Sequence, residues 1–136
     1  MNPWSFYDFL DGRGNNLTRA WLDSLPDKAS AKIDARLLYM QLVMPWPPQY
    51  VSSLTGWPDI FEIRVVSAGS QYRPLACHGV NRGEVILVHG AIEKGKLPKR
   101  VLELADGNRK IALADRTRIR EHVFRRNPDP TKSEGQ

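Results

Sequence analysis

The chain has 136 residues, of which 41% are hydrophobic, a share that excludes a disordered polypeptide and is typical of a domain with its own core. Its single cysteine, Cys77, excludes an internal disulfide and is typical of a reducing compartment. No apolar run approaches the ~20 residues that cross a membrane, and the N-terminus has no signal-peptide pattern. We therefore expect a cytoplasmic protein without a membrane partner.

The net charge of +5 is unevenly distributed along the chain. Residues 1–63 carry five basic and seven acidic side chains, whereas residues 94–126 carry eleven basic and four acidic ones. A localised positive region attracts polyanions such as nucleic acids. The alternative interpretation is a helix with a solvated cationic face.

The first half of the sequence predicts one strand and two helices. Residues 4–10 alternate in part between apolar and polar side chains, as a strand does. A helical spacing of apolar residues over 17–25 ends at Pro26, and a second helical stripe covers residues 27–43. We expect these helices to form a hairpin whose apolar faces cover one side of a sheet.

Residues 45–48 have the sequence Pro-Trp-Pro-Pro and predict a stiff, non-helical connector, because each proline fixes its φ angle and restricts the residue before it. Trp46 has two interpretations. It either stacks on a base or a partner, or it covers the apolar edge between the helices and the sheet.

The second half predicts a three-stranded antiparallel meander over residues 60–66, 72–77 and 85–88, joined by turns that contain glycine and asparagine. Pro74 cannot donate to a strand ladder, so we expect the middle strand to be unpaired there or to lie at an edge. A helix begins at Pro98, and a further helical segment is predicted over residues 109–126, with a break or kink at Gly107.

These elements predict an α+β fold with a single domain over residues 1–126 and a flexible tail over residues 127–136. Arg64 and Arg73 fall on paired strands of the meander, where a rigid sheet can hold two guanidinium groups near each other. Fixed cations of this kind suit an RNA phosphate or the charge that develops when it is cleaved. The three histidines share no ligand spacing and no cysteine pair exists, so we expect no metal and no cofactor.

Five short motifs in the expected order resemble the RelE/ParE toxin superfamily, and specifically its phage-derived, Gp49-like branch close to the HigB toxins. The first three motifs lie on the predicted strands, and the last two form a lysine loop and a helix start. They are Glu62-Ile63-Arg64, Gly69-Ser70-Gln71-Tyr72-Arg73, Ile86-Leu87-Val88-His89-Gly90, Lys94 with Lys96, and Pro98. The resemblance covers roughly residues 6 to 115. Ala91 and Glu93 depart from the pattern, which usually has an aromatic residue and a lysine there.

The resemblance implies a RelE-like fold, in which an N-terminal strand and a helical hairpin pack on a small antiparallel sheet, with a basic C-terminal helix. It also implies a type II toxin that cleaves mRNA on the ribosome without a metal. The partners would be the ribosome, mRNA and a cognate antitoxin with a helix-turn-helix domain. Two other classes stay open, namely a ParE-like inhibitor of DNA gyrase and a phage-derived protein that binds nucleic acid without cleaving it.

Carried over onto this sequence, the resemblance assigns the phosphate-stabilising catalytic roles to Arg73, Lys94 and Arg64. The alternative for Arg73 is a structural ion pair with Glu62 or Glu84, and for Arg64 it is the orientation of a neighbouring carboxylate. Five further basic residues are candidate RNA contacts: Lys96, Lys99, Arg100, Arg109 and Arg116. His89 and His122 are candidate acid–base groups, with a structural role as the alternative for His89.

Overall fold

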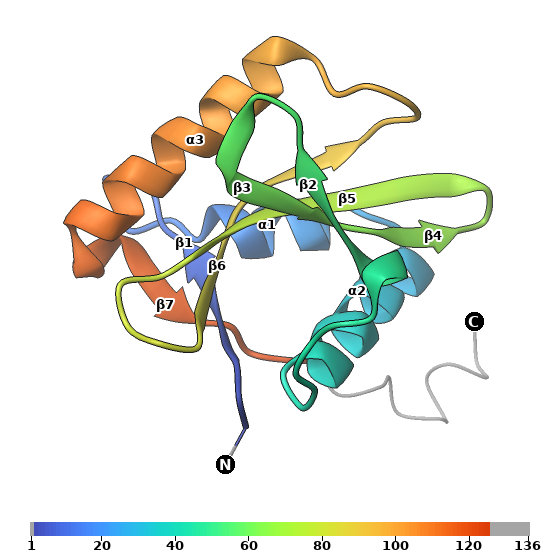
Figure 1. Cartoon of the computed structure of the whole chain (residues 1–136), viewed down its shortest axis with the longest axis horizontal. Helices are drawn as coiled ribbons and strands as arrows, with labels where there is room; N and C mark the ends of the chain where they lie inside the picture. The colour runs from blue at the N-terminus through green and yellow to red at the C-terminus, as the bar shows by residue number, and fades with distance from the viewer. Residues whose placement is uncertain (1, 126–136) are drawn as a thin grey trace.

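The computed structural model describes residues 2–125, so the predicted tail over residues 127–136 lies outside the described residues (Figure 1). Three α-helices and a seven-stranded, mostly antiparallel sheet confirm the α+β fold class. The helices are α1 (Leu17–Asp23), α2 (Asp27–Met40) and α3 (Lys99–Ala114). The strands are β1 (Ser5–Phe9), β2 (Val51–Leu54), β3 (Trp57–Ile63), β4 (Val65–Ser67), β5 (Ser70–His78), β6 (Glu84–Ile92) and β7 (Ile119–Glu121).

The strand order in the sheet is β2-β3-β5-β6-β1-β7, and β4 also pairs with β5. The predicted meander is present as β3, β5 and β6, each pair antiparallel. The first strand inserts beside β6 in parallel, with Phe6 opposite Val85. The antiparallel hairpin of β2 and β3 adds a strand that the sequence did not indicate.

The helices cover both faces of the sheet, because side chains alternate between the faces along each strand. On β6, Val85 and Leu87 join the core beneath α1 and α2, whereas Ile86 and Val88 join the core beneath α3. Ile33 of α2 and Ala105 of α3 are fully buried in these two cores. The predicted helical hairpin therefore covers one face of the sheet, and α3 covers the other (Figure 1).

The C-terminal part differs from the prediction. α3 continues through Gly107 without a break and ends at Ala114, and residues 119–121 form strand β7 instead of a helix. Asp115 caps a short 3-10 turn by accepting a hydrogen bond from the amide of Thr117 at 3.0 Å. β7 then pairs with the free edge of β1, with Tyr7 opposite Glu121. The edge of β1 supplies backbone partners that a helical segment would leave unpaired.

Pro74 explains why β5 loses its strand partner at one point along one of its sides. β5 is an inner strand, yet β3 pairs only with Leu75 and Ala76, and β4 pairs only with residues 70–72. Opposite Pro74, which has no amide hydrogen, β3 ends and Arg64 separates it from β4. The Arg64 amide donates instead to the carbonyl of Tyr50 at 2.9 Å. The expected local loss of pairing at Pro74 is thus present on this side of β5.

Candidate nucleic-acid interface

A cleft of about 570 Å³ lies at this break in strand pairing. It is bounded by α2, by the 3-10 turn of residues 48–50, by the ends of β3, β4 and β5, and by the loop before α3. Its lining includes Arg36, Tyr50, Glu62, Arg64, Arg73 and Gly95. Three arginines and one glutamate thus line the cleft, which gives the lining a net positive charge.

Glu62 organises the cleft. Its carboxylate is buried and accepts hydrogen bonds from Nε of Arg64 at 3.1 Å and from Nε of Arg73. A buried carboxylate requires such partners, because an isolated ion in a protein interior is strongly destabilising. Both structural alternatives raised by the sequence are therefore present, since Arg73 pairs with Glu62 and Arg64 orients the same carboxylate.

The two arginines differ in exposure, and this difference separates their roles. The Arg73 side chain is 11% exposed, whereas the Arg64 side chain is 54% exposed. Nη1 of Arg73 also donates to the carbonyl of Gly95, so two of its three nitrogens are held by the protein. Arg64 is the guanidinium that presents most of its surface to a ligand.

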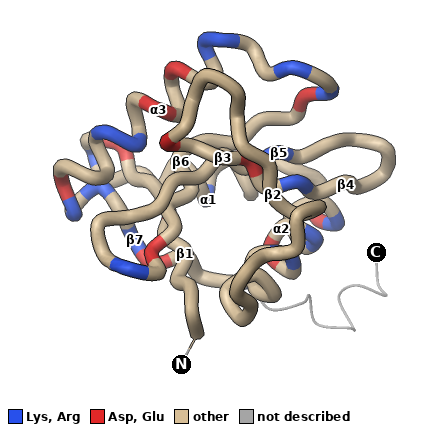
Figure 2. The backbone as a smooth tube through the Cα atoms, viewed as in Figure 1, with Lys and Arg blue, Asp and Glu red and all other residues tan. Residues whose placement is uncertain are grey.

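The contact between Arg73 and Gly95 ties the lysine loop to the sheet. Gly95 has a φ of 77°, a conformation that favours glycine. Lys94 and Lys96 flank this glycine and are both exposed. The bond from Arg73 to Gly95 thus places the loop that carries Lys94 and Lys96 next to the cleft that Arg64 and Arg73 line. In Figure 2, basic positions (blue) lie on the loop before α3 and near β4 and β5.

Arg36 and Tyr50 line the cleft but were missed in the sequence. The Arg36 guanidinium lies 3.8 Å from the centre of the Tyr50 ring, a cation–π geometry, and also donates to the carbonyl of Arg64. On the sequence, Arg36 looks like any charge on the polar face of α2. Its connection to Arg64 depends on a contact across 28 positions and leaves no local signal.

The other basic candidates lie outside this cleft. Lys99 and Arg100 are exposed at the start of α3. Arg109 is held by Asp106 at 2.7 Å, and its Nη2 is 3.7 Å from Asp59. Arg116 makes two hydrogen bonds to Glu84, at 3.1 and 2.8 Å, and these bonds hold the pKa of Glu84 below its usual value.

His89 also lies elsewhere, and its environment favours the neutral form. It lines a separate, mainly apolar cavity of about 250 Å³ beneath α1. Burial lowers the pKa of the His89 imidazole. Its neighbour Gly90 is required by packing, because a Cβ there would lie 2.1 Å from the Trp21 ring.

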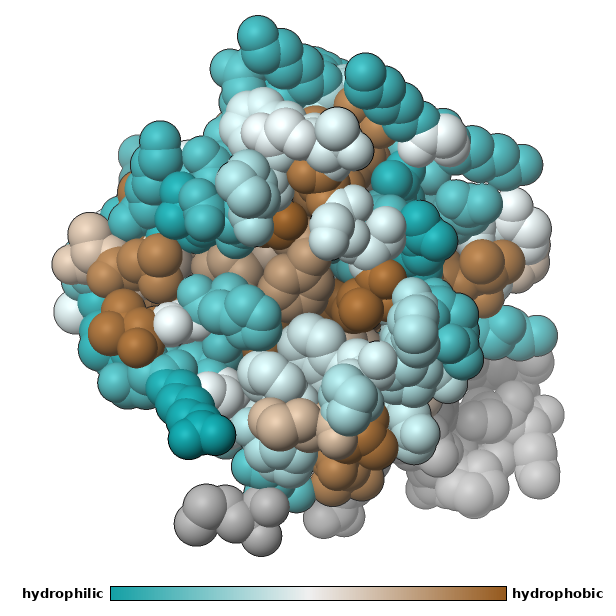
Figure 3. Space-filling model, viewed as in Figure 1, coloured by the Kyte–Doolittle hydropathy of each residue, from teal (hydrophilic) through white to brown (hydrophobic). Residues whose placement is uncertain are grey.

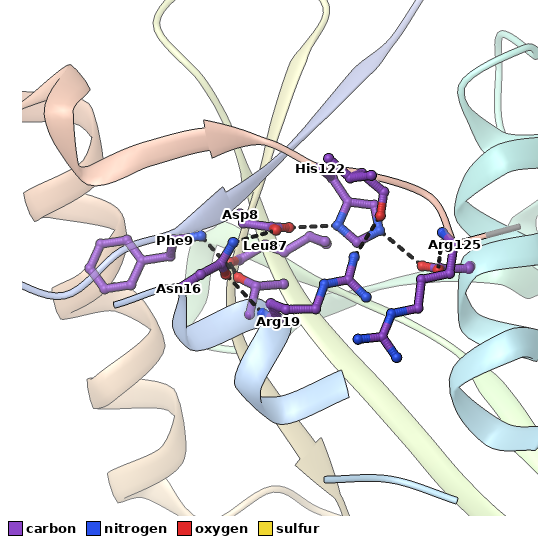
Figure 4. A network of polar contacts seen from close by, with 10 residues as sticks. Asp8, Phe9, Asn16, Arg19, Leu87, His122 and Arg125 are labelled. Carbon is purple, nitrogen blue, oxygen red and sulfur yellow. Dashed lines mark hydrogen bonds and ion pairs between the residues drawn. The ribbon is translucent and has the colours of Figure 1, made fainter. Parts of the chain in front are cut away.

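His122 is enclosed in a buried polar network (Figure 4). Its Nδ1 lies 2.6 Å from a carboxylate oxygen of Asp8, and its Nε2 lies 2.9 Å from one of Asp34. Burial opposes the charged imidazole, but the hydrogen bonds to Asp34 and Asp8 outweigh it, so the pKa of His122 is raised. The network fastens the chain after β7 to β1 and α2, and Arg125 extends it by donating its amide to Asp34 at 3.1 Å.

Among residues 2–125, no group of three or more His, Cys, Asp and Glu side chains is arranged to hold a metal ion. In the same range, no helix combines the length and the apolar character that crossing a membrane requires.

The fold and the cleft define an α+β protein with a preorganised cationic surface. Residues 20–110 match the family described as phage derived protein Gp49-like, and the chain belongs to this family. It is a toxin-like family, linked to RelE/HigB-like toxins. The comparisons with curated proteins and with solved structures gave no significant match. The matched range contains every cleft residue named above, whereas Asp8 and His122 fall outside it.

Proposed function

We propose that this protein is the toxin of a type II toxin–antitoxin system and cleaves mRNA on the ribosome without a metal. The observation that carries the proposal is a cleft lined by Arg36, Arg64 and Arg73, in which two of the arginines share one buried carboxylate and Arg73 ties the lysine loop to the cleft through Gly95. Such a cleft suits a substrate whose reacting group is an anion that gains charge in the transition state.

In the proposed reaction the 2′-hydroxyl oxygen of one nucleotide bonds to the adjacent phosphorus while the bond from phosphorus to the leaving 5′-oxygen breaks. The 2′-hydroxyl loses its proton and the 5′-oxygen gains one, which leaves a cyclic phosphate and a 5′-hydroxyl. Cations close to the non-bridging oxygens stabilise the developing charge, and alignment of the RNA by the ribosome supplies much of the remaining rate.

The contacts suggest different roles for the predicted catalytic residues. We assign direct phosphate contact to Arg64, which is exposed in the cleft, and to Lys94 on the loop beside Gly95. Arg73, which is mostly buried, holds Glu62 and Gly95 in place and is a positioning residue in this proposal. The acid–base groups predicted on the sequence, His89 and His122, do not line the cleft, whereas the phenol of Tyr50 does.

A second candidate function is inhibition of a protein target by binding, as in the gyrase inhibitors. It is favoured by exposed apolar side chains around the end of α2, a kind of surface that marks protein contacts. These are Leu38, Tyr39, Leu42 and Met44. The same surface suits the partner we propose, a cognate antitoxin with a helix-turn-helix domain.

The test is to map mRNA 5′ ends by primer extension after the purified protein is added to a bacterial translation extract. Discrete cuts that require ribosomes are expected. Intact mRNA accompanied by loss of gyrase supercoiling activity would contradict the nuclease and support the inhibitor. Intact mRNA with normal translation and normal supercoiling would contradict both.

A further inference from the structure

A second groove, of about 470 Å³, lies along the hairpin of β2 and β3. Tyr50 and Glu62 line the cleft, and the next residue toward the hairpin tip on each side of it, Val51 and Phe61, lines the groove. The groove lies where β3 separates from the end of β5, and α3 contributes Arg109 to its wall.

Aromatic rings from four distant segments gather at this groove. Trp46, Phe61 and His78 line it, and Trp4 packs behind them at 4.4 Å between the centres of the Trp4 and Trp46 rings. The His78 ring is 5.2 Å from Phe61 and lies nearly parallel to Trp46, with 7° between the ring planes and 6.1 Å between the centres.

These rings are held in fixed orientations. Nε1 of Trp4 donates to the carbonyl of Val43 and Nε1 of Trp46 donates to the carbonyl of Met40, each at 2.9 Å. Both indoles are thus fastened to the end of α2 and the turn after it. A binding surface whose rings are already ordered loses little conformational entropy when a ligand stacks on it.

The rings do more than fill the core. The side chains of Trp4, Trp46 and Phe61 are only half-buried, and His78 is exposed on the surface. Figure 3 shows brown and pale side chains near the centre of this view, with hydrophilic ones among and around them. Polar groups complete the lining, because Ser52, Asp59 and Arg109 bring a hydroxyl, a carboxylate and a guanidinium to the same groove. These groups offer donors and acceptors to the edge of a flat heterocycle.

We propose that this groove holds an unpaired base of the RNA strand whose phosphate binds in the cationic cleft. This inference rests on the proposed function and assigns a base subsite to it. Aromatic side chains beside a positively charged track are the arrangement by which proteins hold single-stranded nucleic acids. Phe61 lies near the end of β3 and Arg64 follows three residues later, just after the strand, so their backbones are at most ~10 Å apart.

The test compares the binding of two oligonucleotides to the 136-residue protein by fluorescence anisotropy. One is a labelled 2′-O-methyl RNA hexamer, which cannot undergo attack by the 2′-hydroxyl, and the other has the same phosphates and sugars but no bases. The wild type should bind the base-containing hexamer about tenfold more tightly, the effect expected for a single stacked base. Equal affinities, or no binding of the base-containing hexamer, would overturn the inference.

Variants at His78 test whether its ring produces the preference for the base-containing hexamer. His78→Ala should reduce the preference for the base-containing hexamer to within about twofold, whereas His78→Phe, which retains a flat ring, should keep it. Val80→Ala changes an exposed side chain two positions away and should leave the preference intact. A full preference in His78→Ala, or its loss in both His78 variants, would show that this ring does not hold the base. Tighter binding of a DNA hexamer of the same sequence would overturn RNA as the occupant.

The outcomes for the two sites are distinguishable. Arg64→Ala should weaken binding of both hexamers to a similar degree, because it removes a phosphate contact and leaves the rings in place. Absence of mRNA cleavage in the translation extract, with the base preference retained, would reject the proposed nuclease and leave the base subsite standing. Cleavage without any base preference would support the proposed nuclease and reject the base subsite.

Discussion

The unequal burial of the two arginines that share Glu62 gives a quantitative prediction. Replacing Arg73 with alanine removes the best-buried partner of a carboxylate that is 2% exposed. Loss of one member of a buried ion pair typically costs about 3–5 kcal/mol. Glu62 keeps its bond to Arg64 in this variant, so we expect about 3 kcal/mol. Arg64→Ala removes a side chain that is more than half exposed, where solvent screening limits the loss to about 1 kcal/mol or less.

The assay is thermal and urea unfolding followed by circular dichroism. For a chain of this size about 1 kcal/mol corresponds to roughly 4 °C in Tm, so Arg73→Ala should lower Tm by about 12 °C and Arg64→Ala by at most about 4 °C. Arg73→Lys keeps the charge but cannot bind Glu62 and Gly95 through separate planar nitrogens, so its Tm should be intermediate. Equal Tm values for Arg73→Ala and the wild type would refute the assignment of Arg73 as the buried support of the cleft.

Three further predictions concern parts of the fold around the cleft. Because the pKa of His122 is raised, its contribution to stability should be complete below about pH 6.5 and should fall as the pH rises through the folded-state pKa; urea unfolding at successive pH values should show this fall in the wild type and not in His122→Asn. Gly90→Ala should destabilise the protein by more than about 2 kcal/mol, because the added Cβ would clash with the Trp21 ring. Gly107→Ala should stabilise the protein by about 0.5–1 kcal/mol, because the space around Gly107 in α3 is open. Similar urea midpoints for the two variants would contradict this packing. Burial raises the pKa of the Cys77 thiol to about 12, so iodoacetamide should label it only after unfolding, as mass spectrometry can show, and fast labelling of the native protein would contradict its buried position.

The elements that local patterns specify were predictable from the sequence. Apolar spacing predicted α1, α2 and the three central strands, and Pro74 predicted the loss of pairing that places Arg64 at the cleft. The helix predicted over residues 109–126 is present only as far as Ala114, the end of α3. The prediction was wrong for residues 119–121, because their apolar spacing also fits a helix and nothing in the local sequence indicates that β1 has a free edge. That edge pairs with residues 119–121 and decides their conformation.

The candidate site was predictable only in part, for a similar reason. Arg73 lies on β5 as predicted, whereas Arg64 lies between β3 and β4 and not on a paired strand, yet both bind the carboxylate of Glu62. By contrast, Arg36 reaches the cleft from α2, and Gly95 reaches it from the loop before α3. Their positions depend on how the helices pack across the sheet, which no local pattern contains. The ring cluster of Trp4, Trp46 and His78 likewise joins segments that are far apart in the sequence.

The most direct test of the central claim is the single-turnover rate of mRNA cleavage on purified ribosomes, measured for wild type, Arg64→Ala and Arg116→Ala. Arg116 is the matched control, since it is also a half-exposed arginine paired with a buried glutamate but lies outside the cleft. The account predicts a 10²- to 10³-fold slower reaction for Arg64→Ala, about the loss caused by removing one charge-stabilising donor, and a wild-type rate for Arg116→Ala. Wild-type cleavage by Arg64→Ala, or equal losses in the two variants, would contradict it.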